Sequence, residues 1–549
     1  MNGGWLIAEA HPYGAWCLVP PLASIVLAIA TRRVVPSLMA GVVAGVLILT
    51  RGDVVQAVPQ LLETHLWKNL AEPDHLRIFA FTMLMGAMVS VIHATGGMRG
   101  LVNALSPLAK GRRGGQLIGW LLGLIIFFDD YANCLLLGNT LRPLTDRLRI
   151  SREKLSFLVD STAAPVSGLA IVSTWVATEI GLIETGYKDF LPPDSTIDGM
   201  GVFIATIPYR FYVILMLAWI PFLALLNRDF GPMLAAERAA RDGRGHARHP
   251  AAVDDQSGVA SGPVRHWLYA VIPVLTMIAV TSWLLIASGA RELNADVWEW
   301  KRWFLYFSKG NSYVALVYAS LAGLTSVMVL AVGRGILTWQ AAREAAFHGA
   351  THVLSALSIL WLAWCLSEIT KPEYLATGGY LAEWISDRIS PAWMPTLIFL
   401  ISAGISFATG TSWGTMGIMM PITIPVTYQL LANAAGGGTV DPHHPILIAS
   451  IGSVLAGSIF GDHCSPISDT TVLSSQSSSC DHVAHVWTQL PYSMLIATAS
   501  VVLGTIPVGF GASPYLMLAL GLAAAVGFLA VFGKSVGTVD DSPKGTREL

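Results

Sequence analysis

Charge is what this sequence has least of. Only 12% of its 549 residues are Asp, Glu, Lys or Arg, whereas a soluble globular protein carries about 25%. Hydrophobic residues make up 54% of the chain and the mean hydropathy is +0.59. The formal net charge of -2 leaves no basic excess, so we expect no nucleic-acid partner. The composition predicts a multi-pass membrane protein whose surroundings are the lipid bilayer.

Cysteine is also scarce, and its pattern excludes two further classes. The five cysteines are scattered and odd in number, and none forms a C-x-x-C pair: Cys17, Cys134, Cys365, Cys464 and Cys480. Neither a disulfide framework nor a thiolate zinc site is indicated, and we expect no cofactor. No Lys or Arg precedes the first apolar run, so that run lacks the basic region of a signal peptide and is expected to remain as a helix.

Apolar stretches of membrane-spanning length recur along the whole chain. They predict an all-α fold with about 11 transmembrane helices, near 16–31, 34–50, 76–97, 156–181, 202–227, 266–289, 311–332, 350–370, 446–473, 488–511 and 513–533. Two more stretches, 115–141 and 393–434, are interrupted by Gly, Thr or Asp. We interpret both as re-entrant hairpins that enter the membrane and return to the same side.

The basic residues support this interpretation, because Lys and Arg concentrate in cytoplasmic loops. Basic groups flank 115–141 on both sides, which places both flanks inside only if that stretch is a hairpin. The same rule puts the acidic segment 182–201 outside and the C-terminal tail inside, with the N-terminus outside. The basic residues used are Arg32, Arg33, Arg99, Lys110, Arg112, Arg113, Arg142, Arg147, Arg149, Arg152, Lys154, Arg228, Arg238, Arg241, Arg244, Arg248, Lys534, Lys544 and Arg547.

The predicted elements repeat with opposite orientation. A first repeat, 34–228, holds hairpin 115–141 and broken helix 156–181; a second, 264–511, holds hairpin 393–434 and broken helix 446–473. A helix at 1–33 precedes them, a polar linker at 229–263 with the composition of a flexible cytoplasmic loop joins them, and a last helix and tail follow at 512–549. Inverted repeats with discontinuous helices are typical of secondary transporters.

Acidic and amide side chains mark the first half of this arrangement. Two adjacent carboxylates at membrane depth are costly unless they bind something, so Asp129 and Asp130 with Asn133 are candidate ion or proton ligands, although one Asp could merely cap a helix. Pro165 frees a backbone carbonyl near Asp160. Nearby hydroxyls could bind Na+ or bond back to their own helices. The further candidates are Asp160, Ser161, Thr162, Ser173 and Thr174.

The second half offers a glycine-flanked hydroxyl cluster and an Asp-His pair. Asp462 and His463 could exchange a proton near neutral pH, or with Cys464 ligate a metal, the least favoured reading because three consecutive residues seldom face one ion. We expect His482 and His485 to be solvated in a cytoplasmic loop, and His352 to be interfacial. The candidates here are Thr409, Thr411, Ser412, Asp462, His463, Ser465, Ser468, Asp469 and Thr470.

Three motifs resemble those of the NhaC-type sodium/proton antiporter family. They are FDDYANCLLLGNTLRPLTDRLRISREKLSFLVDSTAAP from Phe128, SFATGTSWGTMGIMMPI from Ser406 and GSVLAGSIFGDHCSPISDTTVLSS from Gly452, within a resemblance that covers roughly 36–507. The resemblance implies the ion-transporter superfamily fold, with paired hairpins and discontinuous helices, usually as a homodimer in a bacterial-type inner membrane. It implies no enzymatic activity.

The implied function is exchange of Na+ for H+ by alternating access. Members of the family also include malate/lactate exchangers, so coupled transport of a small carboxylic acid is the alternative, and a membrane metalloenzyme is a remote one. We expect one carboxylate to hold either Na+ or H+, with Asp130 the leading candidate. The expected Na+ ligands are Asp130, Asn133, Thr411 and Asp462.

Overall fold

The computed structural model describes the chain from residue 12 to residue 537, with gaps. Residues outside the description are 1–11, 32, 106, 108, 189–196, 245–265, 295, 299–302, 304–305, 307–309, 372, 378–379, 381–388, 467 and 538–549. Part of the acidic segment, most of the predicted linker and the basic residues Lys544 and Arg547 therefore lie outside it.

The described part is almost wholly helical, as the composition predicts. Its first half contains η1 Gly14–Leu18, α1 Val19–Thr31, α2 Val34–Leu49, α3 Val54–Pro59, η2 Gln60–Trp67, α4 Lys68–Ala71, α5 Pro73–Ala94, α6 Gly97–Leu105, α7 Gly111–Ile125, α8 Asp130–Arg147, α9 Arg152–Thr162, α10 Ala164–Ser167, α11 Val176–Lys188, α12 Gly199–Thr206, η4 Ile207–Tyr209, α13 Phe211–Leu226 and α14 Gly231–Arg241.

The second half contains α15 Leu268–Glu292, α17 Ser312–Gly333, α18 Trp339–His352, α19 Leu354–Thr370, η7 Pro391–Trp393, α21 Met394–Thr409, α22 Ser412–Ala434, α23 Pro445–Cys464, α24 Asp469–Ser477, α25 His482–Ser500, η8 Val501–Thr505, α26 Ile506–Gly509 and α27 Pro514–Phe532. Two-residue strands β1 Arg228–Asp229 and β2 Lys534–Ser535 pair antiparallel.

Within the described residues, nine helices are long and apolar enough to cross a membrane, or ten if one bent pair counts as a single span. The protein is thus a multi-pass membrane protein, and the number of candidate spans is close to the predicted number. The helix breaks also fall where the sequence places them. α7 ends before Asp129, α10 ends before an irregular stretch from Leu169, and α23 ends at Cys464. Between α21 and α22 the chain turns through Gly410, whose φ of 70° favours glycine.

Three segments differ from the sequence-based expectation. The predicted helix 202–227 is not straight, because it bends by 55° at Arg210 between α12–η4 and α13. Residues 54–71, to which we assigned no structure, form the continuous helical run α3–η2–α4. The predicted linker begins with an ordered helix, α14, which packs on α9 and α25.

Two ion pairs hold α14 and the strand before it against the starts of α7 and α9. The Lys154 Nζ atom lies 2.5 Å from Oδ1 of Asp229, and Arg112 pairs with Glu237 on α14. All four side chains are nearly inaccessible to solvent. A flexible loop could not keep such charges paired, so this part of the linker belongs to the folded body.

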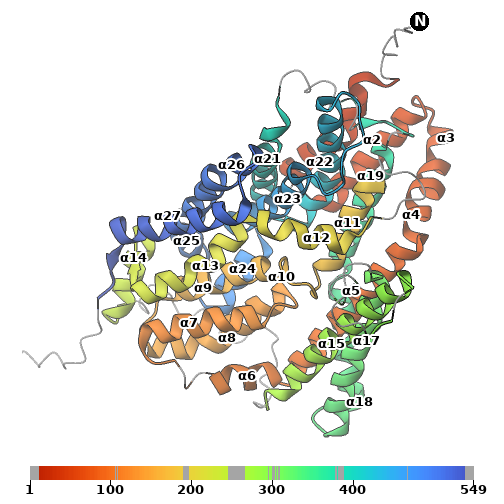
Figure 1. The fold of residues 1–549 in the computed structure, drawn as a ribbon. Coiled ribbons are helices and arrows are strands. Elements are labelled where there is room, and N and C mark those ends of the chain that lie inside the picture. Colours follow the sequence, from red (N-terminus) through yellow and green to blue (C-terminus); the bar gives the residue numbers. More distant parts are fainter. Residues whose placement is uncertain are drawn as a thin grey trace, which may run out of the picture.

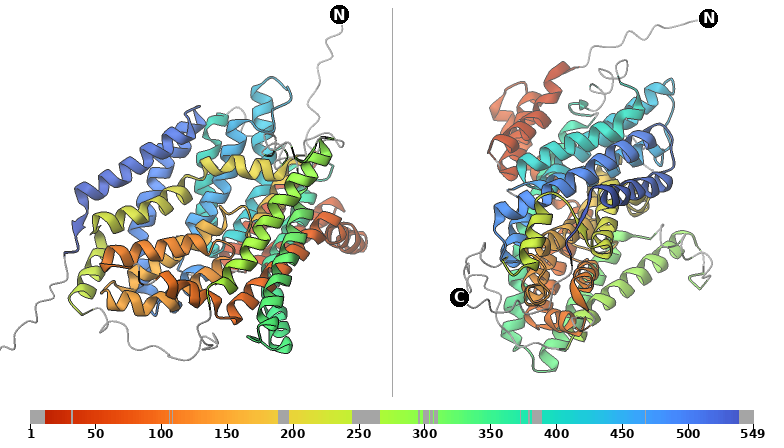
Figure 2. Two further views of the ribbon diagram at one scale, coloured as in Figure 1. Left: turned by 60° about the horizontal axis from the view of Figure 1, so that its bottom comes forward. Right: turned by 90° about the vertical axis from the view of Figure 1, so that its left-hand side faces the viewer.

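Two groups of helices can be followed in Figure 1. At its lower right, α5, α15, α17 and α18 pack on one another. At its left, α7, α8 and α9 lie together, with α13, α25 and α27 above them. The left view of Figure 2 shows α27 running beside α13. The segments around the breaks, α10 and α11 of the first broken helix and α23 of the second, are almost wholly buried.

Close helix packing fixes the broken helices through small residues. A Cβ atom placed at Gly461 of α23 would lie 2.4 Å from the carbonyl oxygen of Ala403 on α21, and one at Gly138 of α8 would lie 2.0 Å from the hydroxyl of Ser477 on α24. Backbones that approach this closely pack well without a hydrophobic driving force, which is the usual solution inside a bilayer.

We predict that Gly461→Ala destabilises the protein by about 1–3 kcal/mol, the range found for overpacked cores. The matched control is Gly404→Ala on α21, since nothing lies within 4 Å of a Cβ atom there. Thermal denaturation of the detergent-solubilised protein measures both. Equal melting temperatures for the two variants would show that α21 and α23 are not in close contact.

Candidate functional site

The first hairpin and the first broken helix meet at their breaks. The backbone N–H of Thr174 donates to the carbonyl of Phe128 over 2.9 Å, and the Thr174 hydroxyl donates to Oδ2 of Asp129 over 3.2 Å. Non-helical backbone in a membrane needs such partners, because lipid supplies none. The two irregular segments therefore satisfy each other, and this places Asp129 beside Thr174.

Asp130 begins α8 and is only 3% exposed. Its Oδ1 accepts a hydrogen bond of 3.1 Å from the indole N–H of Trp175, which lies at the other break. The N-terminus of a helix favours negative charge. A buried carboxylate with one neutral donor still needs a cation or a proton to accompany it.

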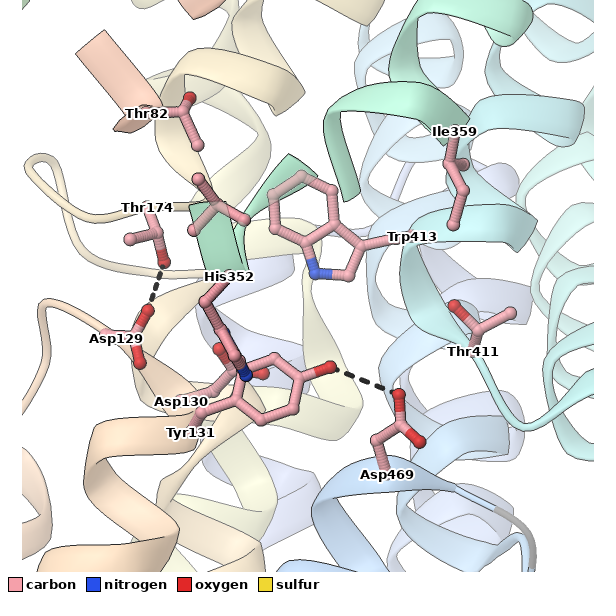
Figure 3. Close-up of a pocket in the computed structure, with 11 residues that line it drawn as sticks. Thr82, Asp129, Asp130, Tyr131, Thr174, His352, Ile359, Thr411, Trp413 and Asp469 are labelled. Atoms are coloured by element: carbon pink, nitrogen blue, oxygen red, sulfur yellow. Dashed lines mark hydrogen bonds between the residues drawn. The ribbon is translucent and has the colours of Figure 1, made fainter. Parts of the chain in front are cut away.

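A pocket of about 100 Å³ adjoins these acids, and Figure 3 shows its walls. The breaks contribute Asp129, Asp130 and Thr174, with Thr411 from the second hairpin and Asp469 from the start of α24. Opposite them lie side chains of α5, α18 and α19. The lining residues are Thr82, Asp129, Asp130, Tyr131, Thr174, His352, Val353, Ile359, Thr411, Trp413 and Asp469.

Aromatic side chains connect the acids of the pocket. The Tyr131 hydroxyl donates to Oδ2 of Asp469 over 3.2 Å, and His352 contacts the Tyr131 ring edge-on at 5.6 Å between centroids. Trp413 packs against Trp175 in a T-shaped pair at 5.4 Å. The expectation that His352 is merely interfacial missed its place in this wall.

A second polar cluster, which we call the Asp160 cluster, is buried apart from the pocket lining. Its centre is Oδ2 of Asp160, which lies 2.7 Å from Nε2 of Gln489, and 3.2 Å from both the Thr471 hydroxyl and Nε2 of His485. Nε2 of His463 lies 4.0 Å from the same oxygen. Asp160 is thus surrounded by partners from α23, α24 and α25.

His463 joins this cluster through two hydroxyls. Its Nε2 lies 3.0 Å from Oγ of Ser161, and its Nδ1 lies 2.6 Å from the hydroxyl of Tyr212 on α13. From the sequence we paired His463 with Asp462, whereas the contacts of His463 in the structure are to Ser161, Tyr212 and Asp160.

The prediction that His485 is solvated is wrong. Its side chain is fully buried, because α25 begins at His482 and turns His485 toward Asp160. Gln489 and Tyr212 were missed altogether. His485 and Gln489 lie one helical turn apart on an apolar helix, and this spacing was the signal that could have identified both residues.

Several predicted ligands hold backbone instead of lining the pocket. The Asn133 amide donates to three carbonyls, those of Gly123, Ile126 and Thr162, at 2.9 to 3.1 Å. Ser173 accepts from the N–H groups of Trp175 and Val176 and so caps α11. Thr162 and Thr409 donate to carbonyls four residues back in their own helices.

The second hairpin and the second broken helix are joined in the same way. The Ser412 hydroxyl donates to the carbonyl of Ser458, and Ser465 donates to that of Phe407. Ser468 caps α24, and the Thr470 hydroxyl lies 3.5 Å from Oδ2 of Asp462. Of the four expected Na+ ligands, Asp130 and Thr411 line the pocket, whereas Asn133 and Asp462 are not among its lining residues.

A buried ion pair that the sequence analysis did not single out supports the first broken helix. Nη2 of Arg210 lies 2.9 Å from Oε2 of Glu179, with both side chains inaccessible. Arg210 also donates to the carbonyl of Gly168, where α10 ends, and lies over the Phe203 ring. It thereby links the bend before α13 to the break before α11.

The arrangement of polar side chains has features of a secondary transporter. In the described part of the chain no group of three or more His, Cys, Asp or Glu side chains is placed to hold a metal ion. Acids and hydroxyls instead gather at helix breaks inside a multi-pass bundle, where transported ions and solutes bind.

The chain belongs to the Na+/H+ antiporter family, whose model matches residues 166–509. It is 33% identical over 504 residues to an uncharacterized protein of Haemophilus influenzae, covering 90% of this chain and 91% of that one. Shorter matches are to the malate-2H+/Na+-lactate antiporter of Bacillus subtilis (31% over 184 residues, 31% and 32% of the two chains) and to the Na+/H+ antiporter NhaC of Alkalihalophilus pseudofirmus (30% over 156 residues, 28% and 29%). The resemblance to NhaC-type antiporters is confirmed.

The fold is similar to that of the YdaH transporter of Alcanivorax borkumensis. The TM-score is 0.53 at 17% identity, covering 84% of this chain and 90% of that one. Similarity at this level supports the transporter fold alone.

We predict that Arg210→Met lowers the free energy of unfolding by about 3–5 kcal/mol, because it leaves the Glu179 carboxylate buried and unpaired. The double variant with Glu179→Leu should melt closer to the unsubstituted protein than Arg210→Met does. Melting temperatures in detergent measure this. A double variant less stable than either single one would contradict the proposed cost of the unpaired charge.

Proposed function

We propose that this protein exchanges Na+ for H+ across a membrane, with the pocket beside Asp130 as the ion site. The observation that carries the proposal is the convergence of helix breaks on Asp129, Asp130, Thr411 and Asp469 around one pocket. Membership of the Na+/H+ antiporter family supports it. Carboxylate and hydroxyl oxygens are hard ligands suited to Na+.

The mechanism that fits this site is competition for one carboxylate. Asp130 is too buried to remain ionised without a partner. It therefore holds either Na+ or H+ whenever the site changes its exposure from one face of the membrane to the other. Exchange follows if the loaded site alternates between the two faces. Thr174 and Thr411, which line the same pocket, would supply neutral oxygens to Na+.

The Asp160 cluster is the second candidate for the proton. Asp160 has two histidines within 4.0 Å, and one of its oxygens, Oδ1, is buried without a hydrogen-bond partner in the described structure. Together with Asp462 and His463 it would carry the proton if Asp130 binds Na+ alone.

For the architecture we propose two inverted repeats, 34–228 and 264–511. The positions of the breaks support this, since α7–α8 and α9–α11 recur as α21–α22 and α23–α24. The N-terminus would lie outside and the C-terminus in the cytoplasm of a cell with a bacterial-type inner membrane. We include a homodimer in the same proposal because the resemblance to the family implies one.

Exchange of small carboxylic acids is the second candidate function. The match to a malate-2H+/Na+-lactate antiporter favours it. The pocket favours it less, because the lining residues include three carboxylates and neither Lys nor Arg.

Flux in proteoliposomes tests the function. Addition of Na+ on one side should change the internal pH reported by a trapped dye, and addition of malate or lactate should not be required. A pH change only when a carboxylic acid is present would transfer the proposal to the second candidate.

We predict that Asp130→Asn yields a folded protein whose coupled Na+/H+ exchange falls at least tenfold, because the amide keeps the shape but cannot ionise. The control is Asp242→Asn at the exposed end of α14. Hydrogen bonds from Arg241 and Arg244 hold the pKa of the Asp242 carboxyl below its usual range, so it stays ionised and takes no part in exchange. Full pH-dependent exchange in Asp130→Asn would move the carrier role to the Asp160 cluster.

The hairpin predicts where two introduced cysteines react. Arg113→Cys and Arg147→Cys, at exposed positions near the start of α7 and at the end of α8, should be labelled by an impermeant thiol reagent from the same face. Asp441→Cys, between α22 and α23, should be labelled from the opposite face. All five native cysteines are buried, so background labelling is low. Labelling of positions 113 and 147 from different faces would exclude the re-entrant hairpin.

A further inference from the structure

The charge of the pocket wall restricts what it can bind. Asp129, Asp130 and Asp469 face it. Among the lining residues that the structure describes there is neither Lys nor Arg, and His352 is the one that can carry positive charge. An organic anion entering this space would meet carboxylates without a fixed cation. The wall therefore selects positively charged ligands.

The volume exceeds what a bare metal ion needs. An apolar cavity of about 150 Å³ holds benzene, so about 100 Å³ holds roughly four non-hydrogen atoms. A dehydrated Na+ would leave most of that space to water. A small cation that carries its own carbon or nitrogen atoms would fill it.

The aromatic residues of the wall favour organic cations over Na+. Trp413 is partly exposed beside the acids, and its position is held by the T-shaped contact with Trp175, which itself donates to Asp130. Tyr131 is held in the same way, by its bond to Asp469 and its contact with His352. Rings fixed next to carboxylates form the usual surroundings of ammonium and guanidinium groups.

We propose that this pocket binds a compact organic cation of about four or five non-hydrogen atoms, such as guanidinium or a small alkylammonium ion, at the place where Na+ binds. The inference rests on the proposed ion site, which it deepens by naming a substrate class. The acids would pair with the N–H groups, Thr174 and Thr411 would accept further hydrogen bonds, and Trp413 would cover one face of the cation.

Guanidinium binding to the full-length protein in lipid nanodiscs tests the proposal. Titration calorimetry with guanidinium and methylguanidinium chloride at millimolar concentration should show saturable binding that Na+ displaces, whereas sodium-free lactate and malate should not compete. Trp413→Leu should weaken guanidinium binding at least tenfold, Trp413→Phe should weaken it less, and the loss of guanidinium binding in Trp413→Leu should exceed the loss of Na+/H+ exchange. Trp339→Leu, at an exposed position on α18, should leave both unchanged.

The outcomes separate this inference from the function it rests on. Intact Na+/H+ exchange without guanidinium binding would overturn the organic-cation site and leave the antiporter proposal standing. Guanidinium binding that depends on Trp413, in a protein with no Na+/H+ exchange, would support the organic-cation site and overturn the antiporter proposal. Equal losses of guanidinium binding and Na+ exchange in Trp413→Leu would also overturn the inference, since the ring would then be structural.

Discussion

The satisfaction of backbone polar groups at helix breaks is the constraint on which this structure depends. Lipid offers no hydrogen bonds, so every interrupted helix must find partners inside the protein. The N–H of Thr174 donates to the carbonyl of Phe128, and the side-chain amide of Asn133 is the hydrogen-bond donor for three backbone carbonyls. The hydroxyls of Ser465 and Ser412 do the same across the second hairpin. Because each break is completed by another, the breaks must be adjacent, and the acids that they carry are gathered as a consequence.

The carboxylates near the helix breaks include two groups with different partners, those of the pocket and Asp160. In the pocket, Asp130 accepts a hydrogen bond from Trp175 and Asp469 accepts one from Tyr131. Asp160 instead has an amide, a hydroxyl and two imidazoles around it. A carboxylate with weak, neutral partners is left able to bind a cation, whereas one with several donors is already stabilised. This difference is the physical reason for assigning ion binding to the pocket and treating the Asp160 cluster as its polar neighbour.

Sequence reasoning located the spans and breaks because both are one-dimensional signals. Apolar length marks a span, and Asp, Gly or Pro within an apolar run marks an interruption, so Asp129, Gly410 and Asp462 were found directly. It could not tell ligands from backbone supports, since Asn133 and Ser173 have the same polarity in either role. It also missed partners that come from distant helices. Arg210 and Glu179 pair across a bend that no local pattern announces, and His485 was read as solvated because the start of α25 was placed six residues too late.

The walls of the pocket come from two sets of elements with different internal connections. Asp129, Asp130, Tyr131, Thr174 and Asp469 are tied to one another by hydrogen bonds among the breaks, and close glycine contacts lock the helices that bear them. Thr82 and His352 belong to α5 and α18, which pack on each other, whereas Ile359 belongs to α19, which packs on α2 and α22. Across the pocket the side chains meet through the edge of an aromatic ring, that of Tyr131 against His352. Such a contact slides at little cost compared with an ion pair or a buried hydrogen bond. A binding site built on this boundary can therefore keep its acids together while the opposite wall moves past them, which is the geometric requirement of alternating access.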